Sequence, residues 1–337
     1  GDPARGSDHS QEQRHGDDDP GDATVSLAFA GDVMFGGNVP LLMEQYGGYD
    51  QAFAHAAEWL QEPDVAIANL ETPITDRGEA QDNAWVFRTS PEALPALKRS
   101  GIDAFSLANN HILDYGLEGL EDTIASLSAH EFRFAGAGMN EEEAFAPAIL
   151  DVQGVRVALL GFSLVIPDES WIAAASSPGV AAAQDMEAAE AAVAEAAEQG
   201  DLVVVMVHWG QDRAPNPNAQ QRDTARRYID AGADLVIGTH PQVVQGLERY
   251  KGKWIVYSLG SLVATTNPDY PETWQSMILY AACSRNGDCE LNVVPVNNYQ
   301  AQPNILEASE AEEFYRRLTD RSPNARIDEK GRVTARQ

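Results

Sequence analysis

Five short apolar segments of the chain each end in a side chain that can bind a metal ion or a polar ligand. The residues at these ends are Asp32, Glu71, Asn110 with His111, His208, and His240. In α/β proteins ligands bind at the carboxyl ends of the strands, so these side chains are expected to lie close together. Each also has a simpler interpretation as a turn residue, a helix cap or a buried histidine. Their recurrence at five successive strand ends favours a metal or polar catalytic site.

The spacing of apolar residues predicts strands that alternate with helices, followed by hairpins. Strands are expected at 23–30, 65–70, 102–108, 202–207 and 235–237. Helices are expected at 117–129, where the pattern is amphipathic, at 186–198, which is rich in alanine and glutamate, and at 219–231. Gly47 and Gly48 divide a further helical pattern at 41–61 into two short helices, and residues 243–296 are β in pattern. We expect an α/β sandwich with mixed sheets over residues 23–305, then a short helix and a polar tail over 306–337.

The chain is strongly acidic. It holds 52 aspartate and glutamate residues against 23 lysine and arginine residues, a formal net charge of -29. Nucleic acids and anionic membrane surfaces need a basic footprint on their partner, so this charge argues against both. An acidic surface suits a high-salt habitat, because screening weakens the repulsion between like charges.

Residues 1–22 are almost wholly polar and show no apolar periodicity, which predicts a disordered tether. No apolar run reaches the roughly 18 residues that span a bilayer. The chain starts with Gly1, so we also consider that an upstream segment has been removed. A tether between a membrane anchor and a folded domain is typical of a protein attached to the cell surface.

The two cysteines, Cys283 and Cys289, fall on one predicted hairpin. A three-residue loop of Arg285, Asn286 and Gly287 would place them directly opposite each other. Opposed cysteines can form a disulfide, which would indicate an oxidising compartment. A pair of free thiols on a reduced hairpin is the alternative.

Six motifs surround the strand ends between about residues 26 and 262. They are Gly-Asp-Val-Met at 31–34, Asn-Leu-Glu at 69–71, Ala-Asn-Asn-His-x-x-Asp-x-Gly at 108–116, His-Trp-Gly at 208–210, Gly-x-His-Pro at 238–241 and Tyr-Ser-Leu-Gly at 257–260. In this order they resemble the CapA family of poly-γ-glutamate capsule biosynthesis proteins, which are similar in fold to calcineurin-like metallophosphoesterases. The resemblance implies a four-layer α/β/β/α sandwich of the metallophosphoesterase type, with a metal site at the strand ends.

The same resemblance implies where such a protein works and with what. It predicts an extracytoplasmic, membrane-associated role in the synthesis, export or processing of poly-γ-glutamate. The expected substrate is this anionic polymer or a phosphoester, and membrane-embedded capsule synthesis subunits are the expected partners.

Metallophosphoesterases hold two metal ions, and the resemblance assigns ligands to both. Asp32 belongs to one site, whose other two positions are occupied here by Met34 and Gln242. Thioether and amide groups are poor ligands for a hard or borderline dication, so this site is expected to be weak or empty. One well-bound Zn, Mn or Fe ion is therefore expected, with Asp32 nearby and with these ligands: Glu71, Asn110, His208 and His240.

The chemistry at such a site has two readings. In a hydrolase, His111 would protonate the leaving group and Asp114 would orient it. Arg88 would clamp an anionic substrate, and Asn109 and Gln242 are further candidate substrate contacts. The alternative is a non-catalytic polymer-binding or scaffold subunit that keeps the fold and a vestigial metal site.

Overall fold

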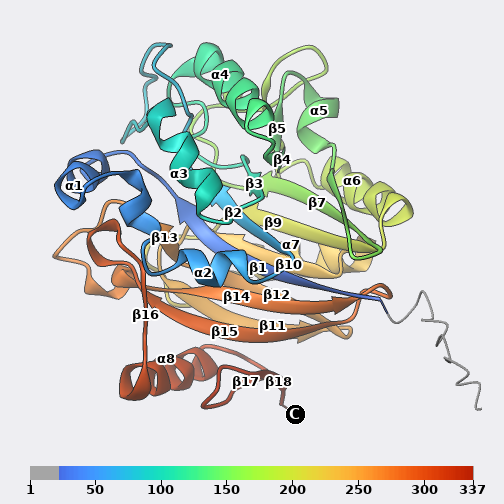
Figure 1. Ribbon diagram of the computed structural model, residues 1–337. Helices are drawn as coiled ribbons and strands as arrows, with labels where there is room; N and C mark the ends of the chain where they lie inside the picture. The colour runs from blue at the N-terminus through green and yellow to red at the C-terminus, as the bar shows by residue number, and fades with distance from the viewer. Residues whose placement is uncertain (1–22, 337) are drawn as a thin grey trace, which may run out of the picture.

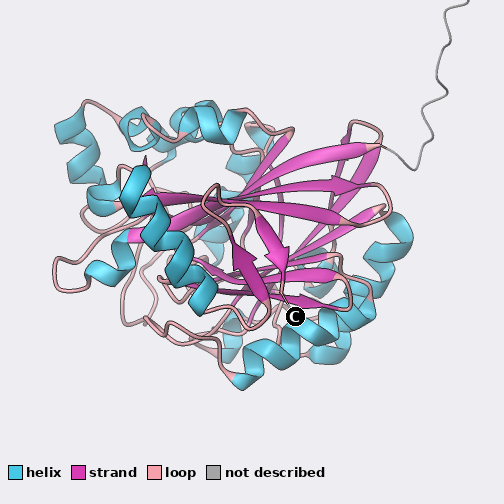
Figure 2. Ribbon diagram, turned by 90° about the horizontal axis from the view of Figure 1, so that it is seen from below, coloured by secondary structure: helices cyan, strands magenta, loops and turns pink. Residues whose placement is uncertain are grey.

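The computed structural model describes residues 23–336, and its elements form four layers. Two β-sheets pack face to face, and helices cover the outer face of each sheet (Figures 1 and 2). This arrangement confirms the expected α/β/β/α sandwich with mixed sheets. The predicted tether at 1–22 lies outside the described residues.

The first sheet is built around β1, in the order β16-β15-β14-β1-β2-β3-β4, and β13 also pairs with β1. β1 to β4 run parallel, whereas β14 to β16 alternate in direction. The carboxyl ends of β1, β2 and β3 therefore meet at one edge. The strands are β1 (Thr24–Val33), β2 (Val65–Leu70), β3 (Ala104–Ser106), β4 (Arg133–Ala135), β13 (Ser261–Val263), β14 (Gln275–Ser284), β15 (Cys289–Asn297) and β16 (Asn304–Ile305).

The second sheet places four parallel strands between two antiparallel edge strands, in the order β11-β12-β10-β9-β7-β6. Its strands are β6 (Ala148–Val152), β7 (Val155–Ser163), β9 (Leu202–His208), β10 (Leu235–Thr239), β11 (Val244–Tyr250) and β12 (Lys253–Leu259). Two further strands, β5 (Ala137–Gly138) and β8 (Gly179–Val180), form a separate short ladder.

The helices divide between the two outer faces. The first sheet is covered by α1 (Val39–Tyr46), α2 (Ala57–Gln61), α3 (Leu94–Arg99) and α4 (Gly116–Ala129). The second is covered by α5 (Glu141–Phe145), α6 (Met186–Gln199) and α7 (Ala219–Ala231). A last helix, α8 (Ala308–Asp320), packs against β11. No helix within 23–336 has both the length and the apolar character to cross a membrane.

The sequence of β9 shows why the sheets are sandwiched. All seven of its residues are buried, because the other sheet covers one face and helices cover the other. Val204 and Met206 join the core between the sheets, whereas Val203 and Val205 join the core beneath α6 and α7. A strand that is apolar on both faces fits only such an inner position.

Three segments differ from the expected pattern. The apolar run at 102–108 is a strand only over β3, because the chain then turns into the loop that carries Asn110. Gly47 ends α1 with a φ of 105°, and the next residues form the 3-10 helix η2 (Tyr49–Phe53) before α2. The expected polar tail contains the ladder of β17 (Ala325–Ile327) and β18 (Val333–Ala335), which contributes apolar side chains to the core between the sheets.

Candidate metal centre

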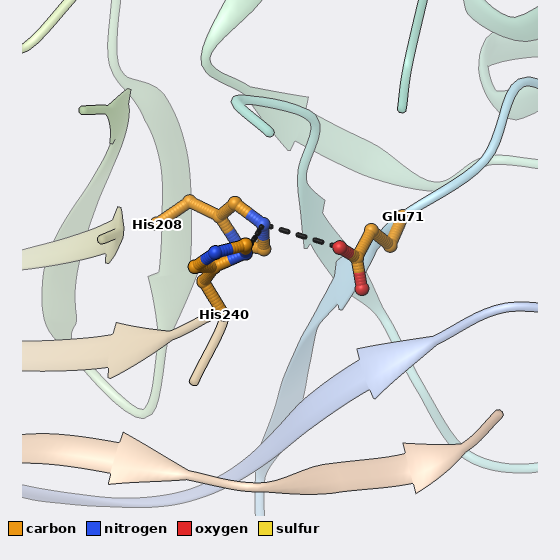
Figure 3. A group of neighbouring side chains, drawn as sticks. All are labelled: Glu71, His208 and His240. Carbon is orange, nitrogen blue, oxygen red and sulfur yellow. Dashed lines mark hydrogen bonds and ion pairs between the residues drawn. The ribbon is translucent and has the colours of Figure 1, made fainter. Parts of the chain in front are cut away.

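Glu71, His208 and His240 come from different sheets and meet at one point (Figure 3). Glu71 follows β2 of the first sheet, whereas His208 ends β9 and His240 follows β10 of the second. The three side chains are buried, and their ligand atoms lie within 4.8 Å of one another. Within residues 23–336, no other group of three histidine, cysteine or acidic side chains is clustered in this way.

The Nε2 atom of His208 is the centre of this cluster. It lies 3.2 Å from Glu71 Oε1, 2.9 Å from Asn110 Oδ1 and 3.2 Å from His240 Nδ1. A dication that binds oxygen and nitrogen at about 2.0–2.2 Å holds neighbouring donor atoms roughly 3.0–3.5 Å apart. Measured from His208 Nε2, the three other donor atoms therefore lie at about the spacing that a single ion requires.

Each histidine also has a partner on its outer nitrogen. His208 Nδ1 lies 2.8 Å from the hydroxyl of Thr239, and His240 Nε2 lies 3.1 Å from a carboxylate oxygen of Asp212. Metal-binding histidines are commonly fixed in this way, because a partner on one nitrogen directs the lone pair of the other toward the ion. Sequence reasoning missed Asp212, and its position four residues after His208 is the only pointer to it in the sequence.

The electrostatics of the centre also fit a cation. Burial lowers the pKa of His208 to about 4, and burial with the nearby charge of His208 lowers that of His240 to about 3. Both rings are therefore neutral near pH 7, which is the form that binds a metal. Burial raises the pKa of Glu71 to about 7, and burial with the charge of Glu71 raises that of Asp32 well above its ordinary value. A divalent ion would stabilise both carboxylates in their charged form.

Asp32 lies beside this cluster, near the end of β1. One of its oxygens accepts a hydrogen bond of 2.7 Å from the amide of Asn69, and the other lies 3.4 Å from the hydroxyl of Ser261. Met34 is buried, and its sulfur accepts a hydrogen bond from the backbone N–H of Gly36. Gln242 is exposed to solvent. Neither Met34 nor Gln242 supplies the imidazole expected at a second metal position.

His111 and Asp114 form a pair next to the cluster, in which Asp114 is buried and His111 is partly buried. His111 Nδ1 lies 2.7 Å from Asp114 Oδ2, and the Asp114 side chain is fully buried. Burial lowers the pKa of His111, but the hydrogen bond to Asp114 and the charge of Glu71 outweigh it, so the net pKa is raised. The pair can therefore hold a proton on the imidazole near neutral pH, with Nε2 left for a ligand.

Asn109 does not fit the substrate-binding role expected from the sequence. Its side chain is fully buried, and its amide donates to Asn69 Oδ1 and to the carbonyl of Leu70. Its oxygen accepts the backbone N–H groups of His111 and Ile112. All of its hydrogen-bonding capacity is used inside the chain, so Asn109 shapes the loop that presents Asn110 and His111.

Arg88 lies on a loop that Asp114 holds in place. The carboxylate of Asp114 accepts the backbone N–H of Phe87 at 2.8 Å, and the Phe87 ring lies 4.9 Å from the His111 ring. The exposed Arg88 guanidinium lies 4.7 Å from the centre of the Tyr115 ring. Arg88 thus stands next to the His111–Asp114 pair, and contact with substrate stays a prediction.

Comparisons with known proteins cover most of the chain. Residues 26–266 match the family model described as "Bacterial capsule synthesis protein PGA_cap". The "PGA biosynthesis protein CapA" of Bacillus subtilis is 32% identical over 93% of this chain and 82% of its own length. The "Capsule biosynthesis protein CapA" of Bacillus anthracis is 32% identical over 88% of this chain and 73% of its own. A "Probable polyglutamine synthesis accessory protein" of Mycobacterium tuberculosis is 36% identical over 59% of this chain and 55% of its own.

Proposed function

The chain belongs to the bacterial capsule synthesis protein family PGA_cap, and on that premise we propose that it acts on poly-γ-glutamate in the cell envelope through a metal-dependent hydrolytic site. In this role the protein takes part in the synthesis, export or processing of the capsule polymer. Membrane-embedded capsule synthesis subunits are its proposed partners. A phosphoester is the other substrate class that such a site accommodates.

The geometry around His208 Nε2 is the observation that carries this proposal. Side chains from two sheets and three loops bring three donor atoms to within 2.9–3.2 Å of that nitrogen. A scaffold role would not need a buried carboxylate among neutral imidazoles, because such a group costs free energy unless a cation compensates it. We propose that Glu71, Asn110, His208 and His240 hold one Zn, Mn or Fe ion.

The residues around this centre have distinct proposed roles in hydrolysis. Lewis-acid activation of water and of the scissile bond is the chemistry that a bound divalent ion supplies. His111 holds a proton at Nε2 and delivers it to the leaving group, while Asp114 fixes the ring through Nδ1 at 2.7 Å. Asp212 and Thr239 orient the two metal-binding imidazoles through the nitrogens that face away from the centre.

A second candidate function is a non-catalytic polymer-binding subunit. It is favoured by the two positions that depart from a two-metal site. The sulfur of Met34 is engaged by the N–H of Gly36, and Gln242 is exposed. A chain with one ligand cluster could retain the ion for structure and bind polymer without cleaving it.

The pairing of the cysteines supports a location outside the cytoplasm. Cys283 and Cys289 are directly opposed across β14 and β15 and form a disulfide. Disulfides persist mainly in oxidising compartments, so we propose an extracytoplasmic protein that is either anchored to the membrane at the cell surface or secreted. Labelling of thiols in the denatured protein, with and without prior reduction, tests this. If both cysteines are labelled without reduction, the disulfide is absent in the cell and the proposed location is contradicted.

Metal content and polymer cleavage test the hydrolase. Elemental analysis of chain purified without chelators or an affinity metal is expected to give about one equivalent of Zn, Mn or Fe, which His208→Ala removes. The metal-loaded chain is expected to shorten a fluorescent γ-linked glutamate oligomer, and His111→Ala is expected to abolish cleavage while keeping the metal.

The matched control for both variants is His130→Ala. His130 caps the end of α4, where its ring contacts the carbonyl of Ser126 outside the centre. If the His111→Ala variant cleaves the oligomer as fast as the His130→Ala control, His111 is not the proton donor. Oligomer binding without cleavage by the metal-loaded wild type would favour the binding subunit.

A further inference from the structure

Arg213 lies next to the metal centre, on the loop after β9, and nothing in the sequence pattern singled it out. It follows Asp212, whose carboxylate contacts His240. The backbone N–H of Arg213 donates to the carbonyl of Pro241 at 2.8 Å, and Pro241 follows His240 in the chain. The loop after β9 is thus fixed to the loop after β10 at the residues that adjoin the cluster.

The backbone at this corner is held in an uncommon conformation. Arg213, His240 and Gln242 have φ values of 61°, 102° and 67°. Residues other than glycine rarely adopt positive φ, and each such residue costs free energy that the surrounding structure must offset. Three of them side by side indicate that this corner is built to present particular side chains.

The guanidinium of Arg213 is supported by an aromatic ring. It lies 3.8 Å from the centre of the Tyr270 ring, on the loop between β13 and β14. That loop is ordered by its own hydrogen bonds: the N–H of Tyr270 donates to Asn267, and its carbonyl accepts from Thr273. Tyr270 therefore offers a fixed platform on which the guanidinium rests.

The donors of Arg213 remain available for a ligand. No ion pair within residues 23–336 includes Arg213, although the protein carries a net charge of -29. A guanidinium that lies on a ring face keeps its N–H groups in its own plane, where they match the two oxygens of a carboxylate. Arg88 over Tyr115 repeats the arrangement on the loop held by Asp114.

We propose that Arg213, supported by Tyr270, binds a carboxylate of the substrate beside the metal centre. The inference rests on the proposed function, because a γ-linked glutamate chain carries one free α-carboxylate on every residue. A local positive centre on the rim lets an acidic protein hold such a polyanion at the cluster, where the overall charge alone would repel it. Arg213 would then fix which bond of the polymer lies over the metal.

Binding of a short fluorescent γ-linked glutamate oligomer to the metal-loaded chain, followed by anisotropy, tests this inference. Arg213→Gln is expected to weaken binding at least tenfold, since a charge-assisted pair with a carboxylate is lost. Tyr270→Leu is expected to weaken binding in the same direction because the guanidinium loses its platform. Metal content is expected to stay unchanged in both variants.

Arg249→Gln is the matched control. Its guanidinium also lies on an aromatic ring, 4.9 Å from the centre of Trp254, but near the far end of β11. The variant makes the same change in net charge, and oligomer binding is expected to change less than twofold. Equal binding by Arg213→Gln and Arg249→Gln would overturn the inference, as would a wild type that does not bind the oligomer.

Two further readouts separate this inference from the proposed function. Absence of cleavage with tight, Arg213-dependent binding would count against the hydrolase and support the carboxylate site. Inorganic phosphate serves as the second probe, in competition with the oligomer. If Arg213→Gln weakens phosphate binding and leaves oligomer binding unchanged, the carboxylate assignment is overturned in favour of a phosphoester.

Discussion

Asp212 Oδ1 lies 3.1 Å from His240 Nε2, on the side of the ring that faces away from His208. The carboxylate is largely exposed, yet it contacts an imidazole that is almost fully buried. This contact sets which nitrogen of His240 carries its proton and leaves Nδ1 for the metal. Asp212, an exposed residue, therefore determines which nitrogen of the buried ligand His240 can bind the metal.

Asp212→Asn is expected to weaken metal binding about tenfold, because partners of metal-binding histidines commonly contribute that much or more. The measurement is competition with a chelator of known affinity, followed by the signal of the released metal. Asp223→Asn makes the same charge change on α7, on an exposed side chain. Equal metal affinities for the two variants would contradict the positioning role.

Asp114→Asn is expected to loosen the loop that carries Arg88 and to alter His111. Asp114 accepts hydrogen bonds from Phe87, Asn83 and His111 at 2.7–3.0 Å, and an amide would turn N–H groups toward some of these donors. The free energy of unfolding is expected to fall by about 2 kcal/mol in urea titrations. The pKa of His111, followed by NMR, is expected to fall because its partner loses its charge.

Asp122→Asn is the control for that variant. Asp122 is partly exposed on α4 and pairs with Arg77, so its loss is expected to cost less than about 1 kcal/mol. If Asp114→Asn is no less stable than Asp122→Asn and the pKa of His111 is unchanged, Asp114 does not hold the loop.

Much of the fold follows from local pattern. The run at 202–207 is apolar at every position, which fits only a strand covered on both faces, and it ends at the histidine that turns toward the cluster. The polar ends of such strands could be recognised because each interrupts an apolar run. The same argument located Glu71 and His240.

Other features depend on contacts that no local pattern contains. β1 pairs with β14, so that Thr24 lies opposite Ser284, and nothing near either segment indicates this pairing. Asp212 and Arg213 lie on an irregular loop, and contacts with His240 and Pro241, far away in the sequence, place them at the centre. Asn109 was a candidate substrate contact, but its side chain turns into the fold.

Salt is expected to stabilise the protein, since like charges repel across its surface. The last turn of α6 carries no basic residue, and the exposed Glu195 and Glu198 oppose the helix dipole there. The thermal midpoint is expected to rise between about 0.1 and 2 M KCl, as the screening length falls from roughly 10 Å to a few Å. Glu195→Gln with Glu198→Gln is expected to raise the midpoint at low salt and to reduce its salt dependence. A thermal midpoint that does not change with the KCl concentration would show that charge repulsion does not limit the stability of this acidic protein.

The chelator-treated chain is expected to lose stability as the pH rises through neutrality. The pKa of Glu71 is raised from 4.5 to about 7, chiefly by burial, so the folded chain binds this proton more tightly than the unfolded chain does. The stability that the proton contributes is complete below pH 4.5 and is lost as the pH rises through about 7. The raised pKa of Asp32 acts in the same direction. The stability that the Glu71 proton alone contributes at low pH is on the order of 3 kcal/mol.

Urea unfolding of wild type and Glu71→Gln in EDTA, from pH 5 to pH 8, measures the contribution of Glu71 together with its effect on the pKa of His111. The buried histidines, with pKa values lowered to about 4 and about 3, titrate below this range and are present in both chains. The wild type is therefore expected to lose stability relative to Glu71→Gln as the pH rises. A bound dication is expected to reverse the trend in the wild type, because it favours the ionised carboxylate. A stability difference between the two chains that is independent of pH would show that Glu71 is ionised in the folded chain without a metal.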